Sequence, residues 1–201
     1  MDQKQSDIIL KSANLFLKHG IKSVTMDDLA RELGVSKKTI YKYFDDKDDL
    51  ITKIVKDRTS TDRKVCENAR TESENAIEAL FSISEFISTM LSEVHSSVFF
   101  DLQKYHKKAW NLMHEHRVNF VKSQIKENIK RGQKEGLYLE SLHPEVIASI
   151  YISTMNALFD ARIFDMSSLK FNEIFNEIIF FQIRGMASEK GVEYLKMKNK
   201  H

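Results

Sequence analysis

Apolar residues recur at helical spacing from the start of the chain. Ile9, Ala13 and Phe16 lie at i, i+4 and i+7, which places them on one face of a helix. Gly20 follows where a helix commonly ends, because glycine tolerates the left-handed conformation of a C-terminal cap. The pattern therefore predicts a first helix over about residues 6–19.

A second, shorter apolar series follows directly. Thr25 is a suitable N-cap, and Met26, Leu29 and Leu33 lie at i, i+3 and i+7 behind it. Gly34 interrupts the series after about eight residues, so a short helix is predicted over residues 25–33.

A third helix is predicted after Ser36, which again suits an N-cap. Its apolar pair is Ile40 and Phe44, and at about 100° per residue Lys38 and Lys42 fall on the opposite face. Two short helices around a glycine-containing turn, the second with an exposed basic face, are typical of a helix-turn-helix. We place this motif at about residues 25–44.

Helical patterns continue to the end of the chain. A long helix is predicted from Lys47, which turns polar near residues 58–68, and Pro144 suits the first position of a later helix. With one proline and six glycines in 201 residues, helix breakers are scarce and the fold is predicted to be all-α. Further helices are expected over residues 73–93, 97–110, 111–131, 144–164 and 168–188, followed by a frayed tail over 190–201.

The global charge does not indicate a nucleic-acid partner, because 31 basic residues nearly balance 29 acidic ones. Locally, residues 35–44 contain three lysines and no acid.

The single Cys66 excludes an internal disulfide framework, and no Cys/His spacing suggests a metal site. We expect a cytoplasmic protein, without a signal peptide or a membrane span, since the uncharged stretch 146–159 is too short and too polar.

Residues 5–55 resemble the TetR/AcrR family of transcriptional regulators. The resemblance is carried by Val24-Thr25-Met26-Asp27-Asp28-Leu29-Ala30, by Gly34-Val35-Ser36-Lys37-Lys38-Thr39-Ile40-Tyr41-Lys42-Tyr43-Phe44 and by Lys47-Asp48-Asp49-Leu50. It implies that the third helix is a DNA recognition helix. The implied DNA-binding residues are Thr25 and Lys47 on phosphates, Ser36 as the cap, Tyr41 and Tyr43 on phosphates, and Lys37, Lys38, Thr39 and Lys42 near the bases.

The resemblance also implies a division of the chain. Residues 1–50 would form the three-helix DNA-binding domain, and residues 51–201 a larger helical domain for effector binding and dimerisation. The last two long helices would build a homodimer, which would present two recognition helices to an inverted-repeat operator. Small residues recur every four positions on the first of them, and the second has seam-like spacing. The residues concerned are Ser149, Ser153, Ala157 and Ala161, and then Phe171, Ile174, Ile178, Phe181 and Gly185.

A small-molecule effector that releases the DNA is implied by the resemblance alone, and its identity stays open. The residues expected to line its pocket are apolar or aromatic, apart from one amide: Phe99, Trp110, Met113, Phe120, Tyr151, Met155, Asn156 and Phe159. Apolar and aromatic side chains like these belong to a protein core far more often than to a pocket, and Asn156 could instead pair with Asp160 or Arg162 or face solvent. We therefore predict a ligand-responsive repressor, or alternatively a helix-turn-helix interaction or architectural protein without a small-molecule switch.

An enzyme is a remote alternative. His106, His114 and His116 do not share a helical face, so they do not converge on one metal or substrate. The sequence has no glycine-rich phosphate loop, nucleophile elbow or His-Glu-x-x-His pattern. We predict no catalytic residues, no metal and no cofactor.

Overall fold

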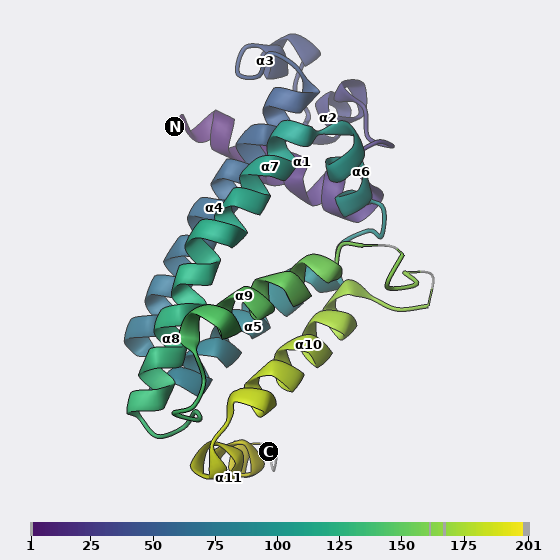
Figure 1. Ribbon diagram of the computed structural model, residues 1–201. Coiled ribbons are helices and arrows are strands. Elements are labelled where there is room, and N and C mark those ends of the chain that lie inside the picture. The colour runs from purple at the N-terminus through teal and green to yellow at the C-terminus, as the bar shows by residue number, and fades with distance from the viewer. Residues whose placement is uncertain (1, 161, 167, 199–201) are drawn as a thin grey trace. The chain divides into compact units, whose positions relative to one another are not determined.

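The structure, a computed structural model, describes residues 2–160, 162–166 and 168–198 (Figure 1). Over these residues the regular elements are all helical, and the sole β-type pairing is an isolated antiparallel bridge between Tyr138 and Ala187. The predicted all-α fold is therefore confirmed. The chain divides into two compact units, which we call the N-terminal unit (residues 1–61 and 93–114) and the C-terminal unit (residues 62–92 and 115–201).

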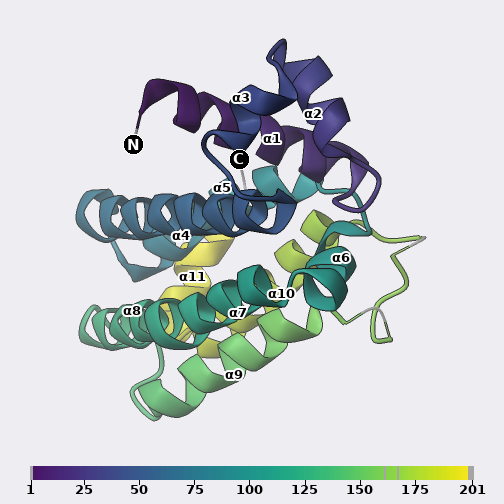
Figure 2. The ribbon, with the colours of Figure 1, turned by 90° about the horizontal axis from the view of Figure 1, so that it is seen from above.

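The N-terminal unit contains the predicted helix-turn-helix. Its helices are α1 (Gln3–His19), α2 (Met26–Leu33), α3 (Lys37–Tyr41), the first part of α4 (Lys47–Glu72), α6 (Val98–Tyr105) and most of α7 (Lys107–Glu115). Figure 2 shows α1, α2 and α3 gathered at one end of this unit. Leu29, Ile40, Phe44 and Leu50 are fully buried, so each helix contributes its apolar face to one small core.

Residues 93–114 pack with the first helices although they are distant in sequence. The carboxylate of Asp101, a buried residue, accepts a hydrogen bond from the backbone N–H of Lys22 at 2.9 Å. The N–H of His95 donates to the carbonyl of Leu17 at 2.7 Å. The DNA-binding domain predicted at residues 1–50 is a functional division, and it stays a prediction; the compact unit of the structure also includes residues 51–61 and 93–114.

The C-terminal unit is a bundle of longer helices. They are the end of α4, α5 (Ala76–Ser92), the π-helix η1 (His116–Val121), α8 (Lys122–Lys134), α9 (Pro144–Ala157), α10 (Phe171–Met186) and α11 (Glu189–Lys198). Helix α5 packs against both α10 and α8, and α8 also packs against α9, as Figure 1 shows. The core of this unit lies between these faces and includes Ile77, Ile129 and Ile183.

The prediction of a frayed tail is wrong for residues 190–198, which form α11 with the residue before them. The Ser188 hydroxyl accepts a hydrogen bond from the N–H of Gly191 at 3.1 Å and thereby caps the helix. Leu195 is 1% exposed, so the helix is anchored by burial against the bundle. Its own sequence is polar, and the local pattern therefore did not reveal it.

Two other predicted helices have different bounds. The expected helix 144–164 ends at Ala157, because the Asp160 carboxylate binds the backbone N–H and the guanidinium of Arg162 and stabilises a turn instead. The expected Ala161 of the small-residue series lies outside the described residues. The expected helix 111–131 begins at Lys107 and is interrupted by η1. Among the described residues, no helix is both long and apolar enough to cross a membrane.

Candidate functional site

Helix α2 begins with a reciprocal cap at Thr25. The Thr25 hydroxyl accepts from the N–H of Asp28 at 3.1 Å, and the Asp28 carboxylate accepts from the N–H and hydroxyl of Thr25 at 3.0 and 2.6 Å. These hydrogen bonds from Thr25 lower the pKa of Asp28. Thr25 is exposed and could reach a phosphate, but its hydroxyl already fixes the start of α2.

The turn and the start of α3 are fixed by Gly34 and Ser36. Gly34 has φ +65°, a left-handed conformation that favours glycine, and its N–H closes the end of α2. The Ser36 hydroxyl accepts from the N–H of Thr39 at 3.1 Å and lies 2.8 Å from the Thr39 hydroxyl. Ser36 therefore orients α3 and ties Thr39 into the same cap.

The outer face of α3 is basic and accessible. Lys37, Lys38, Tyr41 and Lys42 are exposed, whereas Ile40 on the inner face is 0% exposed. The Lys37 ammonium pairs with Asp27 at 2.9 Å, which raises the pKa of Lys37. Within the described part of the chain, neither Lys38 nor Lys42 has an ion pair to an acidic residue. These two ammonium groups therefore carry the available positive charge of this face.

Tyr43 is already engaged by a residue that the sequence pattern did not single out. Its hydroxyl donates to the carboxylate of Asp2 at 2.9 Å, and this hydrogen bond raises the pKa of Tyr43. Asp2 is also the N-cap of α1, since it accepts from the N–H of Lys4 at 2.8 Å. The Lys42 ammonium lies 5.7 Å from the centroid of the Tyr43 ring. No local motif links positions 2 and 43, so only the fold brings them together.

Lys47 lies differently from the other lysines of the motif. Its ammonium donates to the carbonyls of Ile21 at 2.6 Å and Val24 at 2.5 Å, and it lies 5.4 Å from the centroid of the Phe16 ring. Burial lowers the pKa of Lys47. Two of its three N–H donors thus join the start of α4 to the connection between α1 and α2, which leaves one for a phosphate.

Lys53 and His106 also position this face, and sequence patterns did not identify either of them. The Lys53 ammonium donates to the carbonyl of Tyr43 at 3.0 Å and pairs with Asp49 at 2.7 Å. The i, i+4 spacing of Asp49 and Lys53 was a usable signal. His106 Nδ1 lies 2.7 Å from the Asp48 carboxylate, a contact between α4 and the α6–α7 junction that spacing could not suggest.

The residues expected to line an effector pocket lie in both units. Phe99, Trp110 and Met113 belong to the N-terminal unit, whereas the other five belong to the C-terminal unit. The Arg117 side chain donates to Asn156 at 3.0 Å and lies 5.0 Å from the centroid of the Phe159 ring, while burial lowers the pKa of Arg117 to about 10. The Phe120 ring stacks on the His116 ring, with 5.1 Å between the ring centroids. Met155 is buried, and Tyr151 lines a cavity.

That cavity lies within the C-terminal unit and has a volume of about 520 Å³, within the range of small-molecule sites. Its walls come from α4, α5, the end of η1, α8 and α9, and most of them are apolar. The apolar lining residues are Val65, Cys66, Ala79, Leu80, Ile83, Phe86, Ile87, Val121, Ile125 and Tyr151. We call it the apolar cavity.

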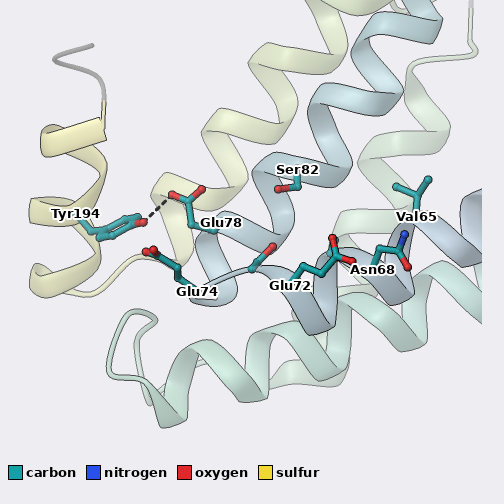
Figure 3. Close-up of a pocket in the computed structure, with 9 residues that line it drawn as sticks. Val65, Asn68, Glu72, Glu74, Glu78, Ser82 and Tyr194 are labelled. Carbon is teal, nitrogen blue, oxygen red and sulfur yellow. Dashed lines mark hydrogen bonds between the residues drawn. The ribbon is translucent and has the colours of Figure 1, made fainter.

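A second cavity of about 600 Å³ lies at the end of α4 and the start of α5. Figure 3 shows the side chains of Glu72, Glu74, Glu78 and Tyr194 around it. The Tyr194 hydroxyl donates to Glu78 at 2.6 Å, and Lys198 forms an ion pair with the same carboxylate. These contacts anchor α11 to α5, so Glu78 serves the fold.

Comparison with known proteins agrees with this geometry. Residues 8–54 match the family model for bacterial regulatory proteins of the tetR family. The Uncharacterized HTH-type transcriptional regulator YvaF of Bacillus subtilis (strain 168) is 24% identical over 174 residues, which cover 84% of this chain and 88% of that protein.

Solved structures share the fold over most of the chain. A TetR-family transcriptional regulator from Agrobacterium tumefaciens superposes with a TM-score of 0.72 at 15% identity, over 92% of this chain and 98% of that one. The transcriptional regulator FadR from Bacillus subtilis, in complex with stearoyl-CoA, gives a TM-score of 0.66 at 17% identity, over 90% and 98% of the two chains.

Proposed function

We propose that the chain is a TetR-family transcriptional regulator, that it represses transcription by binding an inverted-repeat operator as a homodimer, and that a small molecule releases it. The observation that carries the DNA-binding part is α3. Ser36 caps this helix, Ile40 and Phe44 anchor its inner face, and Lys38 and Lys42 project from its exposed face. A basic helix held rigidly on a small core is suited to the major groove.

The nine residues expected to contact DNA are proposed in different roles. Lys38 and Lys42 would approach base edges or phosphates directly, with Tyr41 on an adjoining phosphate. Lys37, Thr39 and Tyr43 would have to exchange or share their contacts within the protein. Thr25, Ser36 and Lys47 would mainly hold the helices in position, with additional phosphate contacts from exposed atoms.

The homodimer is proposed through α9 and α10, the last two long helices. Val146 and Ile150 on α9 are each 52% exposed, and Phe181 on α10 is 78% exposed. A Cβ built on Gly185, one turn beyond Phe181, meets no atom within 4 Å, so this stretch of α10 has room for a second helix. Phe171 and Ile174 of the same series are buried within the protomer, so they would hold α10 in place rather than contact the partner.

We propose the apolar cavity as the effector site, because its lining residues are mostly apolar, whereas three glutamates line the second cavity. Tyr151 belongs to it, whereas the other seven residues expected at a pocket do not line it and remain proposals. The stearoyl-CoA complex of FadR from Bacillus subtilis supports a small-molecule effector for this chain in general, though not its identity. We further propose that the protein acts in the cytoplasm and carries out no catalysis.

Selection from a random DNA library tests the proposal. The purified chain should enrich an inverted repeat whose half-sites are about one helical turn, roughly 34–36 Å, apart. Light scattering should give about twice the monomer mass of 23.4 kDa. Failure to enrich any sequence at moderate salt would contradict specific DNA binding. A helix-turn-helix protein without a switch would bind the same repeat but would not be released by any apolar compound that enters the cavity.

A further inference from the structure

We infer that the apolar cavity takes an uncharged, mainly apolar molecule that carries a hydrogen-bond-accepting oxygen, and that the Tyr151 hydroxyl donates to this oxygen. The inference rests on the proposed function only in naming this cavity as the effector site. All of the residues that line this cavity belong to the C-terminal unit.

The walls favour an apolar ligand. Leu80 on α5 and Ile125 on α8 line the cavity and are 3% and 4% exposed, and Ile83, Phe86 and Ile87 extend the α5 wall. Transfer of apolar surface from water to such walls is favourable by about 25 cal/mol per Å². A polar ligand would lose hydration here without replacement for most of its surface.

Tyr151 brings an uncharged hydrogen-bond donor to the cavity. Its side chain is 7% exposed and lines the cavity, yet its hydroxyl has no hydrogen-bond partner anywhere in residues 2–160, 162–166 and 168–198. Burial raises the pKa of Tyr151, so the phenol keeps its proton at neutral pH. An accepting atom of a ligand in the cavity would give this hydroxyl a hydrogen-bond partner in apolar surroundings.

The neighbouring polar groups are also uncharged. The Gln124 amide lines the cavity and makes no hydrogen bond within the described part of the chain. Burial raises the pKa of Cys66 to about 11, so it is a thiol and a weak hydrogen-bonding group at neutral pH. Together with Tyr151, these groups can orient a carbonyl, ether or hydroxyl oxygen, but they cannot neutralise a charge.

Of the two arginines that line the cavity, Arg131 already has hydrogen-bond partners within the protein. Arg131 Nε pairs with Glu135 Oε1 at 2.6 Å, and its two terminal nitrogens donate to the carbonyls of Arg70 and Ser73 at 3.1 and 2.9 Å. The other oxygen of Glu135 accepts from the N–H of Ala76 at 2.8 Å. This network joins the end of α4 to the start of α5, so an anionic ligand would have to compete with Glu135 for Arg131.

The remaining charged lining residues are mostly acidic. The lining residues include three carboxylates, Asp62, Glu67 and Glu127, against the guanidinium groups of Arg70 and Arg131. Glu127 pairs with Lys130 at 2.8 Å, and Asp62 lies 3.7 Å from His116. Because the lining carboxylates outnumber the guanidinium groups, carboxylate or phosphate ligands are disfavoured, and the apolar walls would not replace the hydration of a cation.

Three matched probes test this inference on the full chain by calorimetry, without DNA: benzophenone, diphenylmethane and 4-benzoylbenzoate. The first two differ only in the carbonyl oxygen, and the third adds a carboxylate to the ketone. Benzophenone should bind about three- to tenfold more tightly than diphenylmethane, as expected for one hydrogen bond to a neutral donor. The carboxylate should bind at least about tenfold more weakly than benzophenone.

Two variants assign the effect to this cavity. Tyr151→Phe should abolish the advantage of benzophenone while leaving diphenylmethane binding unchanged, since it removes only the hydroxyl. Ile83→Trp should weaken all three probes by filling the space. Equal binding of ketone and carboxylate, an unchanged ketone preference in Tyr151→Phe, or no binding of any probe would each overturn the inference. Because DNA is absent from this experiment, failure here is distinct from failure of the operator selection.

Discussion

In the N-terminal unit, the helices begin with caps supplied by neighbouring residues: Asp2 for α1, Thr25 for α2 and Ser36 for α3. In the C-terminal unit, Ser188 caps α11, but α8 and α9 begin without a side-chain cap, and hydrogen bonds between distant segments, such as Arg131 with Ser73, join the helices. The N-terminal unit thus fixes a rigid surface by short-range hydrogen bonds. The C-terminal unit depends more on packing between distant segments, and it contains the apolar cavity that Tyr151 lines.

The difference has a functional consequence. Local caps give α3 one orientation, which suits a surface that must match DNA. Long-range packing allows the walls of a cavity to be built from side chains of α4, α5, η1, α8 and α9. A short sequence motif reveals a surface that local caps hold in place. It does not reveal a cavity whose walls come from distant segments.

The largest expected difference between the two units is in how much a glycine substitution lowers the free energy of unfolding. A Cβ on Gly132 would lie 2.0 Å from the ring of Tyr138, which is 1% exposed and cannot easily move. We expect Gly132→Ala to lower the free energy of unfolding by about 3 kcal/mol, as for overpacked cores. On Gly34 a Cβ meets nothing within 4 Å, so Gly34→Ala should cost only about 1 kcal/mol for its positive φ. Urea unfolding of both variants measures this, and equal losses would contradict the contrast.

Removal of the exposed cations of α3 should affect DNA binding but not stability. The double variant Lys38→Ala, Lys42→Ala should weaken operator binding by about 2 kcal/mol, or roughly 30-fold, because both ammonium groups are exposed and neither forms a close ion pair with an acid in the described structure. Electrophoretic mobility shifts and circular dichroism measure the two properties.

The matched control for this variant is Lys64→Ala, Lys196→Ala, which makes the same change in net charge on exposed residues of the C-terminal unit. Its operator affinity should stay within about twofold of the original protein. If both double variants lose affinity equally, general electrostatic attraction rather than the face of α3 accounts for binding.

Asp2→Asn should strengthen DNA binding by about 0.5 kcal/mol, or roughly two- to threefold. The change removes a negative charge beside Tyr43 and releases its hydroxyl for a phosphate, while asparagine remains a good N-cap for α1. Titration of the selected operator at several salt concentrations measures this effect. In a Tyr43→Phe background the gain should shrink, and a full gain there would show that Asp2 acts without Tyr43.

The smallest effect is expected for a surface contact of the C-terminal unit. Hydrogen bonds from Lys122 and Lys126 lower the pKa of Glu145 to about 2 from an ordinary value of 4.5. A lowered pKa in the folded state adds stability above the unfolded value, and this stability is lost as the pH falls from 4.5 towards 2. Glu145→Gln should therefore lower Tm slightly at pH 7 and not at pH 2. Thermal scans across this range measure it, and a constant difference would contradict the assignment.

Sequence patterns predicted the N-terminal unit more completely than the C-terminal unit. Thr25, Gly34 and Ser36 act within three or four residues of their own positions, so their spacing alone indicated the helix bounds. The exposed basic face of α3 followed from the burial of Ile40 and Phe44. The expected pocket residues were chosen as aromatic or apolar, but that property does not distinguish a cavity wall from a core. Of them, Tyr151 lines the apolar cavity.

By itself, the sequence determined the helical class of this protein, the position of the helix-turn-helix and the basic face of α3, because caps and helical periodicity act over a few residues. Only the tertiary structure decided the contacts of Tyr43 with Asp2 and of His106 with Asp48, the burial of α11, and the cavity that Tyr151 lines. Each of these depends on segments tens of residues apart, and no local pattern records which distant side chain completes a hydrogen bond or closes a space.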